Sequence, residues 1–434
     1  MILLKHAKRL LPTNELVDCD VRIDNGRIME IKPEIIRETE QIIDCEGHLL
    51  LPGFIDVHVH LREPGGEHKE TIQTGAMAAA RGGFTTICAM PNTKPVPDSP
   101  QNLQALQAKI KQDAAIRVLP YASITNGLNG ESLTRIHELA HLGAFAFTDD
   151  GVGIQTADQM LKAMHKAAAC NKPIVAHCED NSLVYQGVVH DGEVSKRLGL
   201  PGITSLSESV QIARDVLLAE AAGCHYHVCH VSTKESVRVI RDAKKAGIHV
   251  TAEVTPHHLL LNETDIPDDH ANFKMNPPLR AKADQQALIN GLLDGTIDLI
   301  ATDHAPHTED EKTQGFLQAP FGIVGLETAF SLLYTNFVKT NVCTLVQLID
   351  WLTIKPAQAF GLPYGRLEEG AIADLTLVDL EKGSQINKDQ FASKGKNTPF
   401  HGWKVTGEPI MTIAEGKLVY KEEIENEAST RAGR

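Results

Sequence analysis

Residues 52–60 read Pro-Gly-Phe-Ile-Asp-Val-His-Val-His, and they are the most informative stretch of the chain. Apolar residues alternate there with Asp56, His58 and His60, which is the two-residue period of a β-strand. The three polar side chains are therefore expected on one face. Two histidines at positions i and i+2 of a strand project side by side and can hold a metal ion. Such a pair is equally common as ordinary surface or core residues, so the interpretation depends on further ligands elsewhere.

The composition is that of a globular protein. The chain has 434 residues, 42% hydrophobic and 23% charged, which suits one large domain with a small one. A net charge of −14 argues against nucleic-acid binding, and no apolar stretch approaches the roughly 18 residues of a membrane span. The eight cysteines form no CxxC pair, and no secretory signal is recognisable. We therefore expect a cytoplasmic protein with reduced thiols.

The middle of the chain alternates between strand and helix patterns. Strands are expected at 54–61, 84–90, 117–124, 144–149, 173–178, 225–231, 248–255 and 298–303. Helices are expected between them, for example at 70–81, 157–169, 206–222, 234–246 and 283–293. This repetition predicts an α/β fold, a (β/α)8 TIM-like barrel. A doubly wound open sheet is the alternative, but no glycine-rich phosphate loop follows any strand.

Both ends of the chain read as short strands separated by turns. These strands are expected at 20–23, 28–31, 41–45, 374–379 and 409–420. Each set is too small to fold alone and leaves open edges. We therefore predict one small composite β-sandwich, formed by residues 1–50 and 363–434, beside a barrel of residues 51–362.

A barrel places its chemistry at the carboxyl ends of its strands, and ligand-type residues stand at those ends. They are Asn92, Asp149, Asp150, His177, His230, Glu253, His257, Asp303 and His307. Together with His58 and His60, three of them (His177, His230 and Asp303) would converge on one mouth from four strands. Imidazole with carboxylate suits zinc and similar divalent ions, and so many ligands predict a pair of ions with a bridge. Glu253, His257 and His258 are supporting or structural candidates.

Several motifs together resemble the cyclic amidohydrolases. They are GFIDVHVHLREPG at 53–65, AMPNT at 89–93, VAHCED at 175–180, HVSTKES at 230–236 and ATDHAPH at 301–307. With three further motifs, the chain is most similar to the dihydroorotases of the class I type. These motifs are FTDDG at 147–151, KMNPPLR at 274–280 and PFGIVGLET at 320–328. The similarity runs essentially from end to end.

The resemblance implies two zinc ions per subunit. His58 and His60 with Asp303 would hold one ion, and His177 with His230 the other. Related hydantoinases and allantoinases bridge their metals with a carboxylated lysine at the end of strand four, whereas residues 144–150 contain no lysine and class I dihydroorotases use an aspartate. Strand alternation groups Asp149 with bulky phenylalanines and Asp150 with small residues that suit a crowded mouth. Asp150 is therefore the predicted bridge and Asp149 the alternative.

The same alternation points two further thiols away from the site. Cys178 and Cys229 adjoin ligand histidines in the sequence, so they should face the opposite side as core thiols.

The activity implied is the reversible interconversion of (S)-dihydroorotate and N-carbamoyl-L-aspartate in de novo pyrimidine synthesis. A metal-bridging hydroxide would attack the ring carbonyl, and Asp303 would carry its proton to the departing nitrogen. Arg62, on the same strand face as His60, can bind a substrate carboxylate through two parallel hydrogen bonds. The resemblance gives further substrate contacts: His60, Asn92 and His307, then Asn276 and the backbone of Phe321 and Gly322.

Two alternatives belong to other classes. A hydantoinase or allantoinase is disfavoured by the missing strand-four lysine and by Arg62. A metal-free amidohydrolase-like scaffold protein would normally have lost ligands, and here the set is intact. The expected partners are the small-molecule substrate, a second copy in a homodimer, and aspartate carbamoyltransferase by association, with neither nucleic acid nor membrane. Residues 308–318 are either a mobile cover of the site or a plain solvated loop.

Overall fold

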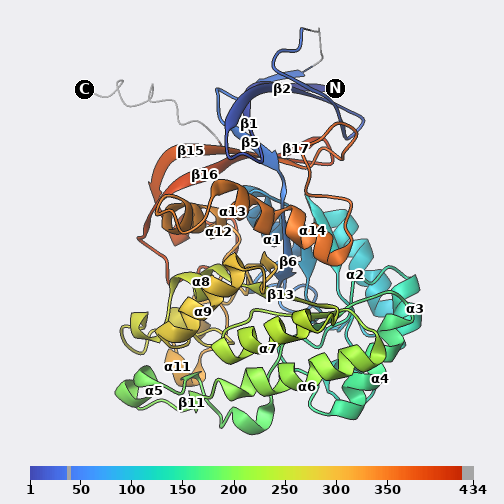
Figure 1. The fold of residues 1–434 in the computed structure, drawn as a ribbon, viewed down its shortest axis with the longest axis vertical. Coiled ribbons are helices and arrows are strands. Elements are labelled where there is room, and N and C mark those ends of the chain that lie inside the picture. Colours follow the sequence, from blue (N-terminus) through green and yellow to red (C-terminus); the bar gives the residue numbers. More distant parts are fainter. Residues whose placement is uncertain (37–40, 423–434) are drawn as a thin grey trace.

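The computed structural model describes residues 1–36 and 41–422. Its centre is a ring of parallel strands, and Figure 1 shows helices lying around these strands. The ladders β6–β7–β8 and β9–β12–β13–β14 make up most of the ring. Single parallel bridges from Phe147 to Ala122 and to Ile174 place the segment around Phe147 between the two ladders, as the fourth position of the ring. A bridge between Val59 and His304 closes the ring. The ring thus has eight positions, which confirms the predicted (β/α)8 barrel.

The elements of the barrel have these bounds. The strands are β6 (Phe54–Val59), β7 (Phe84–Ala89), β8 (Arg117–Pro120), β9 (Ile174–Ala176), β12 (Tyr226–Val228), β13 (Val250–Val254) and β14 (Leu299–Ile300), with a separate pair β10 (Val189–His190) and β11 (Gly202–Ile203). The longer helices are α1 (Ile72–Arg81), α2 (Pro100–Asp113), α4 (Ala157–Ala168), α6 (Leu206–Ala222), α7 (Lys234–Lys245), α9 (Lys282–Leu293), α13 (Leu345–Leu352) and α14 (Ile354–Phe360). The shorter ones are α3 (Ile136–His141), α5 (Glu193–Leu198), α8 (Pro256–Leu260), α10 (Glu309–Lys312), α11 (Gly315–Gln318) and α12 (Ala329–Leu333).

All five helices that we expected are present, each within two residues of its predicted ends. Local signals explain this accuracy. Thr71, Thr156 and Thr233 stand directly before α1, α4 and α7, and each side chain accepts a hydrogen bond from a backbone N–H of the first turn. Threonine caps are visible in a sequence because they act within one turn.

The barrel strands end earlier than the alternation predicts. Strands β9, β12 and β14 were expected to reach 178, 231 and 303, but they leave the ladder at Ala176, Val228 and Ile300. The stretch expected as strand four forms only the bridges of Phe147. Several site residues consequently lie on the segments that follow the strands. Three of them have left-handed backbone, with φ of 61° at Arg62, 30° at His230 and 50° at Asp303, a strained conformation that often marks functional sites.

Strands from both ends of the chain form one eight-stranded sheet above the barrel (Figure 1). They are β1 (Ile2–Leu10), β2 (Leu16–Asp24), β3 (Arg27–Lys32), β4 (Gln41–Asp44), β5 (Leu49–Pro52), β15 (Leu375–Gln385), β16 (Lys404–Ala414) and β17 (Lys417–Lys421). The order is β17-β16-β15-β5-β1-β2-β3, with β4 also paired to β1. Val21 and Ile43 share a core with Leu375 and Ile413. The predicted composite domain is thus one continuous sheet folded around a shared core, and residues 37–40 and 423–434 lie outside the described residues.

The segment between β15 and β16 departs from the predicted division at residue 363. It leaves the sheet and lies over the barrel loops, where Ser393 Oγ donates to Glu70 and Asn397 Nδ2 donates to the carbonyls of Ala305 and Gly322. The terminal part of the chain therefore contributes to the barrel mouth. Within the described residues, no helix combines the length and apolar character needed to cross a membrane.

Candidate active site

Asp150 lies between four histidines at the barrel mouth. Its Oδ1 is 3.4 Å from His58 Nε2 and 4.0 Å from both His177 Nδ1 and His230 Nε2, and its Oδ2 is 3.5 Å from His60 Nε2. Asp303 joins the group from the end of β14. Its Oδ1 is 3.4 Å from His58 Nε2 and 3.1 Å from His60 Nε2. All six side chains are buried. The structure therefore brings together every residue that we predicted as a metal ligand.

Hydrogen bonds fix which nitrogen of His58 and His60 faces this space. His58 Nδ1 is 2.6 Å from Glu253 Oε1, and since a carboxylate only accepts, Nδ1 carries the hydrogen. His60 Nδ1 donates in the same way to the amide oxygen of Asn92, at 2.8 Å. Both Nε2 atoms therefore point at the two aspartates, with His60 Nε2 3.1 Å from Asp303 Oδ1, and they are the atoms through which these rings would bind a metal.

The unpaired atoms of the site fit metal ions. His58 Nε2, His230 Nδ1 and Asp150 Oδ1 are buried and have no hydrogen-bond partner among the described residues. Each such atom costs about 1–3 kcal/mol if nothing satisfies it. Ligand atoms of His58, His230 and Asp303 lie within 4.8 Å of one another, as do those of Asp150, His177 and His230. Nitrogen and carboxylate donors in this arrangement could hold divalent ions.

The electrostatics also favour bound cations. Burial would raise the pKa of Asp150 and of Asp303, but the neighbouring histidines outweigh it and lower both. Burial, helped by the charges of His177 and His58, lowers the pKa of His230 to about 3, so its ring is neutral. Burial would also lower the pKa of His58, but Glu253, Asp150 and Asp303 raise it well above its usual value. Three carboxylates around one imidazole leave an excess of negative charge that a divalent ion would balance.

Asp149, the alternative bridge, faces away from the histidines. Its carboxylate accepts hydrogen bonds from the backbone N–H groups of Ile124 (2.7 Å) and Thr125 (3.0 Å) and from the Thr125 hydroxyl. It therefore fixes the loop after β8. Of the adjacent pair, the structure brings only Asp150 to the predicted ligands.

This difference gives a test of the bridge. We expect Asp150→Ala to weaken zinc binding by more than the roughly 10–100-fold typical of residues that only support a ligand. Asp149→Ala should retain zinc but unfold more easily, because two buried N–H groups lose their acceptor at about 1–3 kcal/mol each. Chelator competition and thermal unfolding measure the two effects. Greater zinc loss in Asp149→Ala, or a carboxylated lysine in the mass spectrum, would contradict the assignment. Because an aspartate bridge needs no carboxylated lysine, activity should also not depend on added bicarbonate.

Cys229 departs from its predicted orientation. It lies in the barrel interior with Val57, Ala146 and Val175, whereas Cys178 packs on the helix side as expected. The left-handed backbone of His230 breaks the strand alternation, so residues 229 and 230 both turn inward. Burial raises the pKa of the Cys229 thiol, which keeps it neutral. Asp56 also departs from expectation, because its carboxylate binds the N–H and hydroxyl of Thr302 instead of facing the site.

A cavity of about 200 Å³ opens beside the predicted ligands. It is lined by His60, Arg62, Asn92, Asp150, Gly151, His177, His230, Asn276, Asp303, Ala305, Phe321 and Gly322. Two of the residues predicted to bind metal or substrate do not line it. His58 is fully buried, and His307 binds the Phe321 carbonyl through Nε2 at 2.8 Å. Arg62 Nε donates to the carbonyl of Pro306 (3.2 Å), and its Nη2 lies 3.1 Å from His307 Nε2.

Asn276 has an acceptor to offer a ligand. Its Nδ2 donates to Glu179 Oε2 at 2.9 Å, while its Oδ1 is buried without a hydrogen-bond partner among the described residues. Sequence reasoning missed Glu179 as a site residue, although it lies within the VAHCED motif. The free oxygen of Asn276 suits a ring N–H group.

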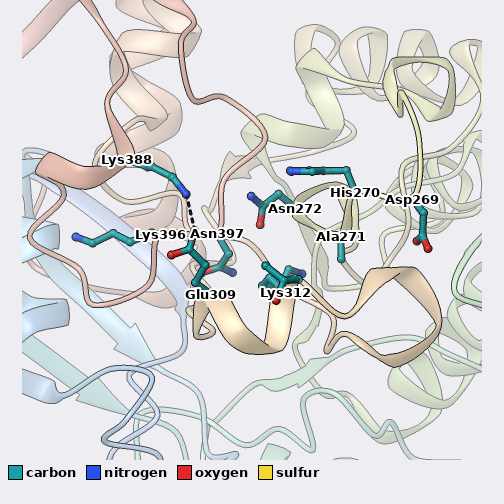
Figure 2. A pocket seen from close by; sticks show the side chains of 10 residues that line it. Asp269, His270, Ala271, Asn272, Glu309, Lys312, Lys388, Lys396 and Asn397 are labelled. Atoms are coloured by element: carbon teal, nitrogen blue, oxygen red, sulfur yellow. Dashed lines mark hydrogen bonds and ion pairs between the residues drawn. The ribbon is translucent and has the colours of Figure 1, made fainter.

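Two other supporting residues carried no local signal in the sequence. Lys312 Nζ donates to the carbonyls of Lys274 (3.1 Å), Pro320 (3.0 Å) and Gly322 (3.0 Å), and it thereby anchors α10 and α11. Residues 308–318 are thus neither a free cover nor a plain loop. Lys312 and Asn397 also line a second cavity of about 250 Å³ (Figure 2). The nearby Lys388 pairs with Glu309 at 3.1 Å, so we interpret this cavity as the outer side of the wall that supports residues 320–322.

Comparison with solved structures places the fold. L-hydantoinase (dihydropyrimidinase) from Arthrobacter aurescens superposes with a TM-score of 0.87 at 25% identity, covering 98% of this chain and 97% of that one. A dihydropyrimidinase from Brevibacillus agri NCHU1002 shares the fold with a TM-score of 0.84 at 23% identity, covering 97% and 95%. This fold, with four histidines and two aspartates at the barrel mouth, defines a cyclic amidohydrolase.

Sequence comparison resolves the family within that class. A family model described as Dihydro-orotase-like matches residues 47–236. A dihydroorotase of Listeria innocua serovar 6a is 64% identical over 422 residues, covering 97% of this chain and 99% of the relative. One from Bacillus pumilus is 62% identical over 421 residues, covering 97% and 98%. The chain belongs to the dihydroorotase family, which confirms the sequence-based expectation of a hydrolase that acts on cyclic amides.

Proposed function

We propose that this chain interconverts (S)-dihydroorotate and N-carbamoyl-L-aspartate in pyrimidine synthesis, with two zinc ions at the barrel mouth. The ions would be held by His58, His60, Asp150, His177, His230 and Asp303. The observation that carries the proposal is the position of the Asp150 carboxylate between all four imidazoles. When bound, such a pair of ions lowers the pKa of a water molecule and polarises a carbonyl group.

Asp303 would move the proton of the reaction. It lines the cavity and lies against His58 and His60, which keep its carboxylate ionised. An ionised carboxylate at this place can take a proton from the attacking water and give it to the ring nitrogen as the C–N bond breaks. In the direction of ring closure, the same group takes the proton from that nitrogen.

The other end of the cavity would hold the substrate. Arg62 and Asn92 line the cavity and would bind the substrate carboxylate together with His307, whose Nε2 lies 3.1 Å from Arg62 Nη2. Asn276 Oδ1 would accept from a ring N–H. Gly322 has φ of 134°, and a Cβ there would lie 2.7 Å from Ala305 Cβ. Only glycine allows this close approach, which leaves the backbone of Phe321 and Gly322 beside the ring.

A substrate panel tests this function on protein with quantified metal. We expect turnover of dihydroorotate and little or none of hydantoin and allantoin, because Asp150 stands where a carboxylated lysine would and Arg62 requires a carboxylate. Preference for hydantoin or allantoin would overturn the proposal in favour of the related cyclic amidases. A protein without metal or turnover would indicate a scaffold.

The equilibrium should depend on pH. Opening the dihydroorotate ring creates a carboxylate and releases one proton near neutrality. Lower pH therefore favours the ring and higher pH the open form, with the ratio changing about tenfold per pH unit by proton linkage. Concentrations of both compounds at equilibrium between mildly acid and mildly alkaline buffers measure this ratio. A ratio that does not change with pH would mean that another reaction is catalysed.

The assembly is part of the same proposal. We propose a cytoplasmic homodimer that associates with aspartate carbamoyltransferase. Sedimentation velocity of the chain, alone and mixed with the transcarbamoylase, tests both contacts. A monomer that does not bind the transcarbamoylase would refute them.

A further inference from the structure

A chain of polar side chains runs through the barrel interior from His58 toward the opposite end of the strands. His58 Nδ1 lies 2.6 Å from Glu253 Oε1, and Glu253 Oε2 lies 3.0 Å from His227 Nε2. Thr251 Oγ1 is then 2.7 Å from His227 Nδ1 and 2.7 Å from His225 Nε2. The last four residues come from the neighbouring strands β12 and β13 and the residue before β12. Glu253 and His227 are fully buried.

The chemistry of the groups fixes the direction of each hydrogen bond. The Glu253 carboxylate only accepts, so His58 and His227 both donate to it, and so does the backbone N–H of His230 at 3.2 Å. In a neutral His227 ring, Nδ1 is then a lone pair, which accepts from the Thr251 hydroxyl. The Thr251 oxygen in turn accepts from His225. Each donor between His58 Nδ1 and His225 Nε2 therefore has an acceptor.

One of the two carboxylate oxygens of Glu253 has its hydrogen bond from His227. Oε1 accepts hydrogen bonds from His58 Nδ1 and from the backbone N–H of His230. Oε2 accepts one hydrogen bond among the described residues, and His227 donates it. Without that donor, a buried charged oxygen would be unpaired, and the carboxylate could relieve this by turning. Turning would remove Oε1 from His58 Nδ1, and this contact holds the ring with its Nε2 3.4 Å from both Asp150 and Asp303.

We propose that His227 is a positioning residue of the metal site, which holds Glu253 so that Glu253 fixes the tautomer and orientation of His58. The proposal rests on the metal pair of the proposed function. A packing role is the competing interpretation, since the His227 ring lies 4.8 Å from that of Phe360. Residues that orient a metal-binding histidine typically contribute 10–100-fold to metal affinity.

Two substitutions of His227 separate these roles. The amide nitrogen of glutamine can occupy the place of Nε2 and still donate to Glu253, whereas that of asparagine reaches only the place of Nδ1. We expect His227→Asn to bind zinc about 10–100-fold more weakly in chelator competition, and His227→Gln to stay within a few-fold of the native protein. His249→Gln is the matched control, because His249 is exposed and its one ring contact with the chain of polar side chains is a stack on His225, the member farthest from His58.

A second readout does not need bound metal. The imidazole proton on His58 Nδ1 should appear far downfield and exchange slowly in ¹H–¹⁵N spectra of the native protein and of His227→Gln, and should exchange faster in His227→Asn. Equal zinc affinity in the two variants, with the same His58 proton, would overturn the proposal. If the native protein binds no zinc, the proposed function fails, and the His58 proton alone decides this inference.

Discussion

Replacing Asp303 with asparagine should lower kcat for dihydroorotate by about 10²–10⁴-fold in both directions while the protein remains folded. The amide nearly matches the carboxylate in shape, but it cannot take a proton from water and give it to the ring nitrogen. Because Asp303 also lies 3.1 Å from His60 Nε2, zinc content must be measured in the same samples. Steady-state kinetics at equal zinc occupancy isolate the proton transfer.

Asp298→Asn is a matched control for this variant. Asp298 directly precedes β14, at the other end from Asp303, where it binds Lys244 at 2.6 Å and the N–H of Ala252 at 2.8 Å. We expect its kcat to stay near that of the native protein. An Asp303→Asn protein with native turnover would show that Asp303 does not transfer the proton.

Arg62→Met should lower kcat/KM for dihydroorotate by at least ten- to a hundredfold. The loss of one charge-assisted contact to a buried anion costs roughly 1.5–3 kcal/mol. Arg62→Lys should recover only part of the loss, because an ammonium group cannot form two parallel hydrogen bonds to a carboxylate. The measurement is kcat/KM of the native protein and both variants.

Dihydrouracil, which has no carboxylate, is the control substrate for Arg62. It should be turned over slowly by the native protein and should respond much less to either substitution. Arg62 also donates to Pro306 and lies beside His307, so a role in shaping the mouth is a real alternative. Equal losses on both substrates would favour that structural role over recognition.

Local patterns predicted the parts of this fold whose causes are local. The helices appeared where the alternation of strand and helix patterns placed them, and residues at predicted strand ends gathered at one mouth. Strand lengths were overestimated because alternation does not show where a ladder ends. At His230, the left-handed backbone turns both Cys229 and His230 inward, and no period-two pattern predicts that change.

Residues that act over long sequence distances were not predictable from pattern. Asn397 binds Ala305 and Gly322 from a segment assigned to the terminal domain, and Lys312 appeared to belong to a solvated stretch. Glu253 was a supporting candidate because it stands at a predicted strand end, but the role of His227 emerges only when β12 and β13 place it beside Glu253. Asp150 could be preferred over Asp149 by side-chain size, but the acceptor role of Asp149 at Ile124 required the structure.

Zinc titration of chelator-stripped protein, followed by turnover of dihydroorotate, tests the central claim most directly. The arrangement of four histidines around Asp150, with Asp303 against two of them, predicts negligible activity without metal and full activity only after two equivalents of zinc per chain. Full activity in the stripped protein would contradict a metal-dependent dihydroorotase. Saturation at one equivalent would contradict the pair of ions.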